Sequence, residues 1–189
     1  MSTLGNLTVL TGPSGVGKGT IVRKILENHS DIWLSISATT REPRSGEIDG
    51  EHYFFLERSD FQEIIDSGGF LEWAQFSNNF YGTPKKFVNE KIGEGINVLL
   101  EIEVEGARQI RKNFPEALQI FLAPPNLSEL EKRIRGRGTE KEESIRDRLA
   151  IANKEINAKK EFDAVVINKD IDIAFKEIEG LMGLNQSKK

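Results

Sequence analysis

Residues 12–18 read Gly-Pro-Ser-Gly-Val-Gly-Lys, a composition and spacing suited to binding phosphate. The three glycines let several backbone N–H groups converge on one anion. Lys18 adds a full positive charge, and the start of the following helix adds its dipole. An apolar run at residues 7–11 precedes the loop, and residues 21–26 repeat apolar side chains at helical spacing. A strand, a glycine loop and a helix in this order predict a P-loop that binds a nucleoside triphosphate.

The residue after the lysine departs from the usual pattern. A Ser or Thr normally stands there and offers its hydroxyl to magnesium, but this chain has Gly19 and places the hydroxyl at Thr20. We therefore expect Mg²⁺ to be held by phosphates, water and a carboxylate elsewhere. A plain glycine-rich turn is the alternative interpretation, and the lysine and both flanks argue against it. The residues of this stretch predicted to bind the nucleoside triphosphate are Gly12, Pro13, Ser14, Gly15, Val16, Gly17, Lys18, Gly19 and Thr20.

Composition limits the class of protein. The chain has 189 residues, enough for one compact domain, of which 38% are apolar and 30% are charged. The net charge of −4 argues against a general nucleic-acid binder, and the absence of cysteine excludes disulfides and fits a reducing compartment. The N-terminus has no signal-peptide pattern, and no stretch is long enough to span a membrane. We expect a cytoplasmic protein without nucleic-acid or membrane partners, either a monomer or a homo-oligomer.

Apolar strands alternate with helices along most of the chain, which predicts an α/β fold with a parallel sheet covered by helices on both faces. Its strands are expected at residues 7–11, 31–37, 97–103, 118–123 and 163–167. Helices are expected at residues 84–93, with Pro84 in the first helical position, and at 107–113, 128–135, 142–161 and 171–182. Between residues 37 and 84 a small β-rich insertion is expected, with strands at 53–56 and 70–76, a capped helix at 59–65 and a turn at 78–79. Only residues 186–189 read as disordered.

Four stretches resemble the guanylate kinase family, in that family's order. They are the P-loop, residues 37–44 (Ser-Ala-Thr-Thr-Arg-Glu-Pro-Arg), Glu-Trp-Ala at 72–74 followed by Tyr-Gly at 81–82, and Arg-Gly-Arg-Gly-Thr-Glu at 135–140. The P-loop alone says little about substrate, but the four together are highly specific. The resemblance covers nearly the whole chain and implies one guanylate kinase-like domain at residues 1–184.

This resemblance implies an architecture and an activity. The P-loop NTPase-type core would comprise residues 1–36, 85–126 and 151–189, with a GMP-binding insertion at 37–84 and a mobile helical lid at 127–150. The implied reaction is Mg²⁺-dependent transfer of the γ-phosphoryl group of ATP to GMP, which gives ADP and GDP in purine nucleotide metabolism.

Glu72 is the candidate for recognising guanine. It stands in an otherwise apolar strand, and guanine offers N–H donors on its pairing edge, so a guanine pocket needs an anionic acceptor. The hydroxyls of Ser37 and Thr83 are available for guanine O6 or N7. A site whose buried groups go unpaired with the wrong base rejects that base, by about 10⁴-fold in the best cases. The alternative for Glu72 is a strand residue that faces solvent.

A phosphate clamp is expected in the loop that opens the insertion. Arg41 and Arg44 lie three residues apart, and the guanidinium fork suits phosphate oxygens, although two loop arginines alone are more often solvated. The chain has eleven Phe but only two Tyr, Tyr53 and Tyr81, and both lie in the insertion, which favours a need for their hydroxyls. The family places its GMP-phosphate contacts at these four positions. Arg41 is also a predicted catalytic residue, as is Lys18 of the P-loop.

Five of the eleven arginines fall within residues 133–148, and Gly136 and Gly138 allow a hinge there, as a closing lid would need. Positioned arginines stabilise the charge that develops during phosphoryl transfer. By resemblance, the catalytic lid arginines are Arg133, Arg137 and Arg148, whereas Arg135 and Arg146 are expected to be structural or solvated. The alternative is a solvated helical face held by ion pairs with glutamates.

Glu101 and Glu103 follow a buried strand, at the carboxyl end where α/β proteins bind ligands. Glu103 is expected to approach guanine or the water shell of the metal. By resemblance, Asn168 after the last strand matches a position that contacts the adenine of ATP. No general base is expected, because a GMP phosphate oxygen is already ionised near neutral pH.

Two other functions remain open from the residues. A kinase of another nucleoside monophosphate or a sugar phosphate would keep the P-loop and lose the guanine acceptor, and Glu72 with Ser37 argues against it. Guanylate-kinase-like domains also serve as non-catalytic binding modules. Such a module would have an eroded P-loop and would lack the lid arginines, whereas this chain keeps the P-loop lysine, Lys18, and the lid arginines.

Overall fold

The protein is described here from a computed structural model, which describes residues 4–136 and 142–184. Packing divides the chain into two units. The unit that we call the P-loop unit holds Thr8–Asp31, Glu101–Val104 and the chain from Leu118 onward. The other, the Glu72 unit, holds the chain up to Leu7, Ile32–Leu100 and Glu105–Ala117. The predicted division into core, insertion and lid therefore stays a prediction.

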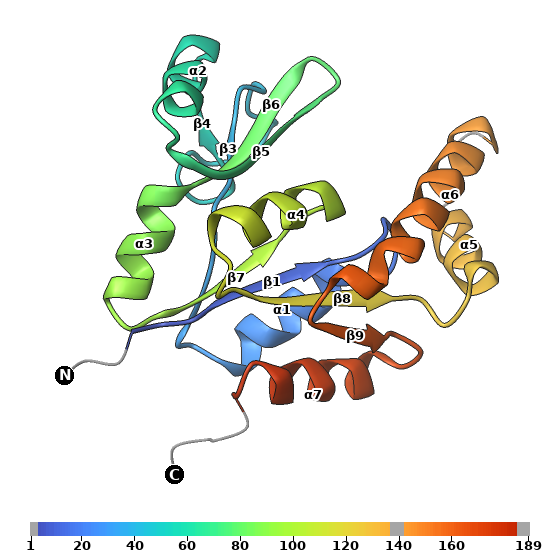
Figure 1. The fold of residues 1–189 in the computed structure, drawn as a ribbon. Helices are drawn as coiled ribbons and strands as arrows, with labels where there is room; N and C mark the ends of the chain where they lie inside the picture. The colour runs from blue at the N-terminus through green and yellow to red at the C-terminus, as the bar shows by residue number, and fades with distance from the viewer. Residues whose placement is uncertain (1–3, 137–141, 185–189) are drawn as a thin grey trace. The chain divides into compact units, whose positions relative to one another are not determined.

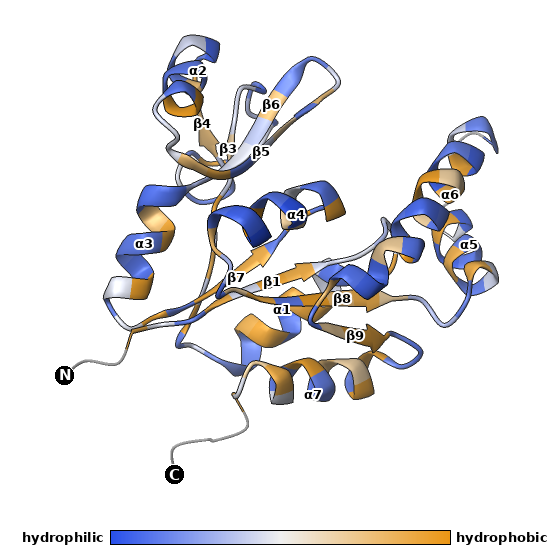
Figure 2. Cartoon of the chain, viewed as in Figure 1, coloured by the Kyte–Doolittle hydropathy of each residue, from blue (hydrophilic) through white to orange (hydrophobic). Residues whose placement is uncertain are grey.

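The P-loop unit is built on parallel strands. Strand β1 (Leu7–Thr11) pairs with β8 (Leu118–Ala123), which pairs with β9 (Ala164–Ile167). Within this unit the hydrogen-bonded order is β1-β8-β9. Figure 2 shows β8 and β9 as predominantly hydrophobic. Strand β8 is buried after its first residue, as expected for a strand covered on both faces, whereas Val165 and Ile167 of β9 are exposed.

Among the described residues of this unit, four helices and a short 3₁₀ turn accompany these strands (Figure 1). They are α1 (Lys18–Asn28), α5 (Leu127–Arg135), α6 (Glu142–Asn157), the 3₁₀ turn at Ala158–Glu161 and α7 (Ile171–Leu181). Helices α1 and α7 pack side by side. The side chain of Asp170 caps α7 and that of Asn126 caps α5, each by accepting backbone N–H groups of the first turn.

The Glu72 unit contains two sets of strands. Strands β2 (Ile32–Leu34) and β7 (Asn97–Glu101) form a parallel pair. A second, four-stranded sheet has the order β4-β3-β6-β5. Its strands are β3 (Ala38–Thr39), β4 (Phe54–Phe55), β5 (Phe70–Phe76) and β6 (Asn79–Pro84).

Helix α2 (Arg58–Asp66) covers this second sheet through a small aromatic core. Phe61 of α2 is fully buried and stacks on Phe70 and Phe80, with ring centroids 4.4 and 5.5 Å away. Helices α3 (Lys85–Gly93) and α4 (Val104–Asn113) complete the unit. The sheet therefore has its own hydrophobic core, which makes it a stable platform for side chains on β5 and β6.

The predicted fold class, α/β with a parallel sheet flanked by helices, is confirmed, while several predicted boundaries were wrong. Pro84 is extended (φ −64°, ψ 121°) and ends β6, so α3 begins at Lys85. Helix α2 starts at Arg58, with Glu57 as its N-cap and no capping side chain. The helix expected to reach residue 161 ends at Asn157, where the chain tightens into the 3₁₀ turn.

Two strands and one turn also differ from their predicted positions. Strands β2 and β7 are shorter than the predicted 31–37 and 97–103. The turn expected at residues 78–79 is centred one residue earlier, because Ser77 takes the left-handed conformation (φ 56°) and Asn79 already belongs to β6. Residues 186–189 lie outside the described part of the chain. Over the described ranges, no helix has both the length and the hydropathy required to cross a bilayer.

The aromatic core gives a test of the second sheet. We expect Phe61→Ala to lower the free energy of unfolding by about 3–5 kcal/mol, because it leaves a cavity between two stacked rings. Urea denaturation of wild type and variant measures the difference. Phe76→Ala is the matched control, since Phe76 lies on the same sheet but is 76% exposed. Similar small losses from both variants would contradict the role assigned to the core.

Candidate active site

The P-loop conformation depends on two glycines. Gly12 has φ 142°, and a Cβ there would lie 2.2 Å from the carbonyl oxygen of Leu122. Gly17 has φ 105° and forms the N-cap of α1, where a Cβ would lie 2.7 Å from Nδ2 of Asn168. Neither position admits another residue without moving the backbone.

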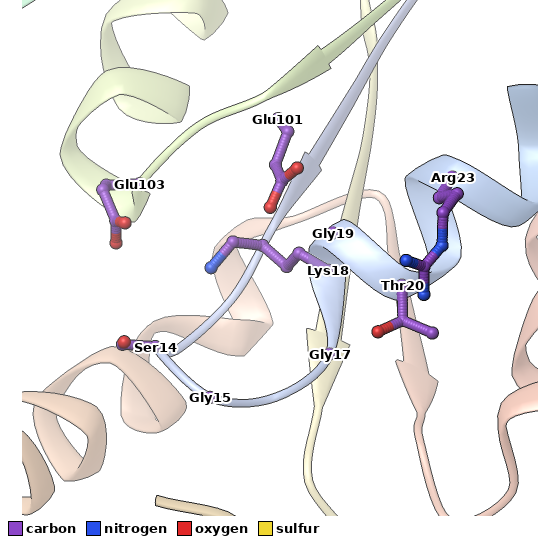
Figure 3. A pocket seen from close by; sticks show the side chains of 9 residues that line it. All are labelled: Ser14, Gly15, Gly17, Lys18, Gly19, Thr20, Arg23, Glu101 and Glu103. Atoms are coloured by element: carbon purple, nitrogen blue, oxygen red, sulfur yellow. The ribbon is translucent and has the colours of Figure 1, made fainter. Parts of the chain in front are cut away.

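The loop borders a cavity of about 360 Å³ within the P-loop unit (Figure 3). The lining residues are Ser14, Gly15, Gly17, Lys18, Gly19, Thr20, Arg23, Glu101 and Glu103. Lys18 is only 9% exposed, and its Nζ donates to the carbonyl oxygen of Gly12 at 2.6 Å. A helix N-terminus and a lysine on one cavity are an arrangement that can bind phosphate groups.

Glu101 faces the position where a P-loop hydroxyl is missing. Its carboxylate oxygens lie 3.7 and 3.8 Å from the point where a Cβ on Gly19 would stand. Although the residue as a whole is exposed, loss of water around the carboxyl raises its pKa above 4.5, an effect that nearby Lys18 partly offsets and Glu103 increases. The described residues contain no group of three or more His, Cys, Asp or Glu side chains placed to bind a metal. A carboxylate beside the phosphate site fits a Mg²⁺ ion held mostly by phosphates and water.

The carbonyl oxygen of Val16 receives two donors that fix the loop. Nδ2 of Asn168 donates to it at 2.8 Å, and Nη1 of Arg133 donates to it at 3.2 Å. Nη2 of Arg133 also donates to the carbonyl oxygen of Asn168 at 2.8 Å. Asn168 is buried (4% exposed), so in this structure its amide holds the loop. Its predicted contact with adenine is not tested.

The other arginines of the predicted lid lie in different surroundings. Nη2 of Arg148 donates to the hydroxyl of Ser14 in the loop at 2.9 Å. Arg137 lies outside the described residues. Arg135 pairs with the carboxylates of Glu131 and Glu142 at the surface. The structure therefore brings Arg133 and Arg148 to the P-loop and directs Arg135 to surface ion pairs.

In the Glu72 unit, Glu72 is buried rather than facing solvent. It is 7% exposed, and its carboxylate accepts a hydrogen bond from the Thr83 hydroxyl at 2.6 Å. Burial raises the pKa of this carboxyl above its usual 4.5, while hydrogen bonds from Thr83 act in the opposite direction. Ser37 lies immediately before β3, where its carbonyl accepts from the Phe54 N–H. A buried carboxylate with one hydroxyl partner is an acceptor that can receive further N–H donors.

Arg41 stands at the centre of a polar and aromatic cluster. Its guanidinium donates two hydrogen bonds to the carboxylate of Glu47, at 2.9 and 3.0 Å, and lies 5.4 Å from the ring centre of Tyr53. The rings of Tyr53 and Tyr81 are 6.2 Å apart. Arg44 joins the cluster through its backbone N–H, which donates to Glu47 at 2.7 Å, and the residue is otherwise exposed. Three of the four predicted clamp side chains thus lie together.

Comparisons with known proteins agree on one family. A family model described as guanylate kinase matches residues 4–184. The guanylate kinase of Prochlorococcus marinus (strain NATL2A) is 84% identical over 184 residues, which cover 97% of this chain and 99% of the relative. The chain belongs to the guanylate kinase family.

More distant members of the family agree. The guanylate kinase of Synechococcus sp. (strain CC9311) is 62% identical over 180 residues, 95% of each chain. The crystal structure of guanylate kinase from Anaplasma phagocytophilum superposes with a TM-score of 0.75 at 31% identity, covering all of this chain and 89% of that one. The family resemblance of the sequence motifs is therefore confirmed, while the roles of single residues in this member are not tested.

Sequence reasoning missed two side chains at these sites. Glu47 holds Arg41, but it is one of several acids in a polar loop, and nothing in the local pattern distinguishes it from Glu42 or Asp49. Arg23 lines the P-loop cavity. Residues four apart share a helix face, so its position four residues after Gly19 could have indicated that Arg23 faces the P-loop.

The Arg41–Glu47 pair predicts a dependence of stability on pH. Hydrogen bonds from Arg41 and from the Arg44 backbone lower the pKa of Glu47 to about 2 from 4.5. A carboxyl with a lowered pKa stabilises the folded state above the unfolded pKa and loses that effect as pH falls through the folded one. We expect the difference in the free energy of unfolding between wild type and Glu47→Gln to be constant above about pH 5.5. The difference should shrink as the pH falls from 4.5 toward 2.

Urea denaturation at several pH values measures this difference. Glu42→Gln is the matched control, because Glu42 is an exposed acid of the same loop, and its difference from wild type should not follow that curve. A Glu47→Gln difference that stays constant down to pH 2.5 would contradict the ion pair.

Proposed function

We propose that the protein transfers the γ-phosphoryl group of ATP to GMP with Mg²⁺, giving ADP and GDP. Membership of the guanylate kinase family over almost the whole chain supports this activity. The observation that carries the choice of acceptor is the Glu72 carboxylate, which is buried and accepts a hydrogen bond from the Thr83 hydroxyl. Adenine and pyrimidine monophosphates do not present the same pair of N–H donors that guanine offers to a carboxylate.

The P-loop unit supplies the ATP site in this proposal. Backbone N–H groups of residues 12–20 bind the phosphates, and Lys18 exchanges its bond to the Gly12 carbonyl for the outer phosphates. Arg133 and Arg148, which already contact the loop, stabilise charge on the transferring group, and Arg137 is proposed to join them. Asn168 is proposed to contact adenine through the part of its amide that does not hold Val16.

The Glu72 unit supplies most of the GMP site. Glu72 accepts the N–H donors of the guanine edge, and Ser37 and Thr83 offer hydroxyls to O6 or N7. Arg41 and Arg44 bind the phosphate with Tyr53 and Tyr81. Glu103 of the P-loop unit is kept as a proposed contact for guanine or for the water shell of the metal.

The reaction requires positioning more than proton transfer. The attacking oxygen of GMP is already ionised near neutral pH, so the chain's residues align it and neutralise charge. When bound, Mg²⁺ would neutralise the charge that develops on the ATP phosphates. Glu101 would hold its water shell, since Gly19 offers no hydroxyl and the Glu101 carboxylate faces that position. A cytoplasmic location is also part of the proposal, because a chain without cysteine suits a reducing compartment.

The proposed activity is tested by following ADP formation from ATP and Mg²⁺ with GMP, AMP, UMP, CMP or no acceptor. The proposal expects turnover with GMP far above every other condition. Turnover with a different monophosphate would keep the P-loop argument and contradict the role of Glu72. No turnover with any acceptor, from folded protein that binds GMP, would favour a binding module.

Replacing Lys18 distinguishes a residue needed for phosphoryl transfer from one needed for GMP binding. We expect Lys18→Ala to lower kcat by about a hundredfold or more, because it removes the full positive charge nearest the transferring phosphates. GMP binding, measured by calorimetry, should change by less than about threefold, since the proposed GMP contacts lie mainly in the other unit. Equal loss of turnover and GMP affinity from a folded variant would show that this division of labour is wrong.

The guanine acceptor has its own test. We expect Glu72→Gln to weaken GMP binding by about tenfold to a hundredfold, because it removes a charged acceptor and leaves N–H donors facing an amide. The affinity for ATP should stay within about twofold of wild type. Calorimetry with each nucleotide measures both values, and equal losses for ATP and GMP would count against a role in base recognition.

A further inference from the structure

The strand that carries Glu72 lies at the edge of its sheet. Strand β5 pairs with β6 on one side only, since it ends the order β4-β3-β6-β5. Its register with β6 is also irregular, with a bulge between Phe70 and Glu72. An edge strand presents unpaired backbone groups, and a bulge loosens the ladder. Pairing with β6 alone therefore leaves the backbone around Glu72 weakly fixed.

Helix α4 satisfies the free edge with two amide side chains. The Trp73 N–H donates to Oε1 of Gln109 at 3.1 Å, and Nε2 of Gln109 donates to the Trp73 carbonyl oxygen at 2.9 Å. Nδ2 of Asn113 donates to the carbonyl oxygen of Leu71 at 2.7 Å. The Gln109 amide thus offers β5 one donor and one acceptor, as a neighbouring strand would.

The spacing of the two elements makes this match possible. Gln109 and Asn113 are four residues apart on α4, a rise of about 6 Å along the helix. Leu71 and Trp73 are two residues apart on β5, a separation of about 6.8 Å along a strand. The two amides can therefore meet the two backbone positions that flank Glu72. All these residues belong to the Glu72 unit.

We infer that Gln109 and Asn113 are positioning residues for recognition of the base. They hold the backbone on both sides of Glu72, so the buried carboxylate keeps the orientation set by its bond to Thr83. Neither amide is required to touch the nucleotide. This inference rests on the proposed function, because it deepens the specificity of the same guanine site.

Base discrimination is the property that tests this inference. IMP lacks the 2-amino group of GMP, so it makes fewer bonds to a carboxylate and loses less when that carboxylate is displaced. We expect Gln109→Ala to raise KM and Kd for GMP about tenfold and those for IMP about two- to threefold, so that the preference for GMP falls about three- to fivefold. KM for ATP should stay within about twofold.

Two further variants sharpen the experiment. Gln109→Glu keeps the acceptor for the Trp73 N–H but sets a carboxylate oxygen against the Trp73 carbonyl oxygen, so its GMP affinity should fall at least as far as that of Gln109→Ala. Asn113→Ala should lower the GMP preference in the same direction. Gln75→Ala is the matched control, because Gln75 is an exposed amide on the same strand whose bond, to the Ser77 carbonyl, is long at 3.4 Å. It should leave the preference unchanged.

The affinities for GMP, IMP and ATP distinguish positioning of Glu72 from a purely structural role of the two amides. A selective loss for GMP over IMP, with ATP unaffected, supports positioning of Glu72. Equal losses for GMP, IMP and ATP with a lower melting temperature, or no loss at all, would overturn it, since the amides would then only stabilise the fold or do nothing for binding. Absence of GMP turnover and binding in wild type itself would overturn the proposed function and this inference with it.

Discussion

The close approach of the Gly12 backbone to the Leu122 carbonyl is the constraint on which the P-loop unit depends. It lets β1 run beside β8 and turn at once into the loop, which returns to start α1 at Gly17. From there, Asn168 and Arg133 both bind the Val16 carbonyl, so the end of β9 and helix α5 are tied to the same loop. A single tight backbone contact thus sets the shape of an anion site built from residues far apart in the chain.

A common principle links the charged groups at the two proposed nucleotide sites. Each is held by a protein partner in this structure: Lys18 by the Gly12 carbonyl, Arg41 by the Glu47 carboxylate and Glu72 by the Thr83 hydroxyl. Such bonds restrict the rotamers of long side chains before a ligand arrives, which lowers the entropy lost on binding. They also satisfy buried polar atoms that would otherwise be unpaired. The same network therefore serves stability and preorganisation.

The sequence predicted what depends on local pattern. The P-loop, its strand and its helix are contiguous, so their order alone indicated the site, and the alternation of apolar strands with helices indicated the sheet. Glu72 stood out because its chemistry contrasts with an apolar strand. Gln109 did not, because its bonds to Trp73 join residues 36 positions apart on different elements. Local preference predicts Pro84 at the first position of a helix, whereas pairing with Phe70 in the sheet keeps the Pro84 backbone extended.

The proposed function requires the buried Glu72 carboxylate to bind guanine while the arginine and tyrosine cluster binds the phosphate of the same nucleotide. A crystal structure of the protein with GMP is the experiment that tests this arrangement. We expect the guanine N1–H and 2-amino groups within hydrogen-bonding distance of the Glu72 carboxylate, and the phosphate against Arg41, Arg44, Tyr53 and Tyr81. A bound GMP whose base lies away from Glu72, or whose phosphate contacts none of these four residues, would contradict it.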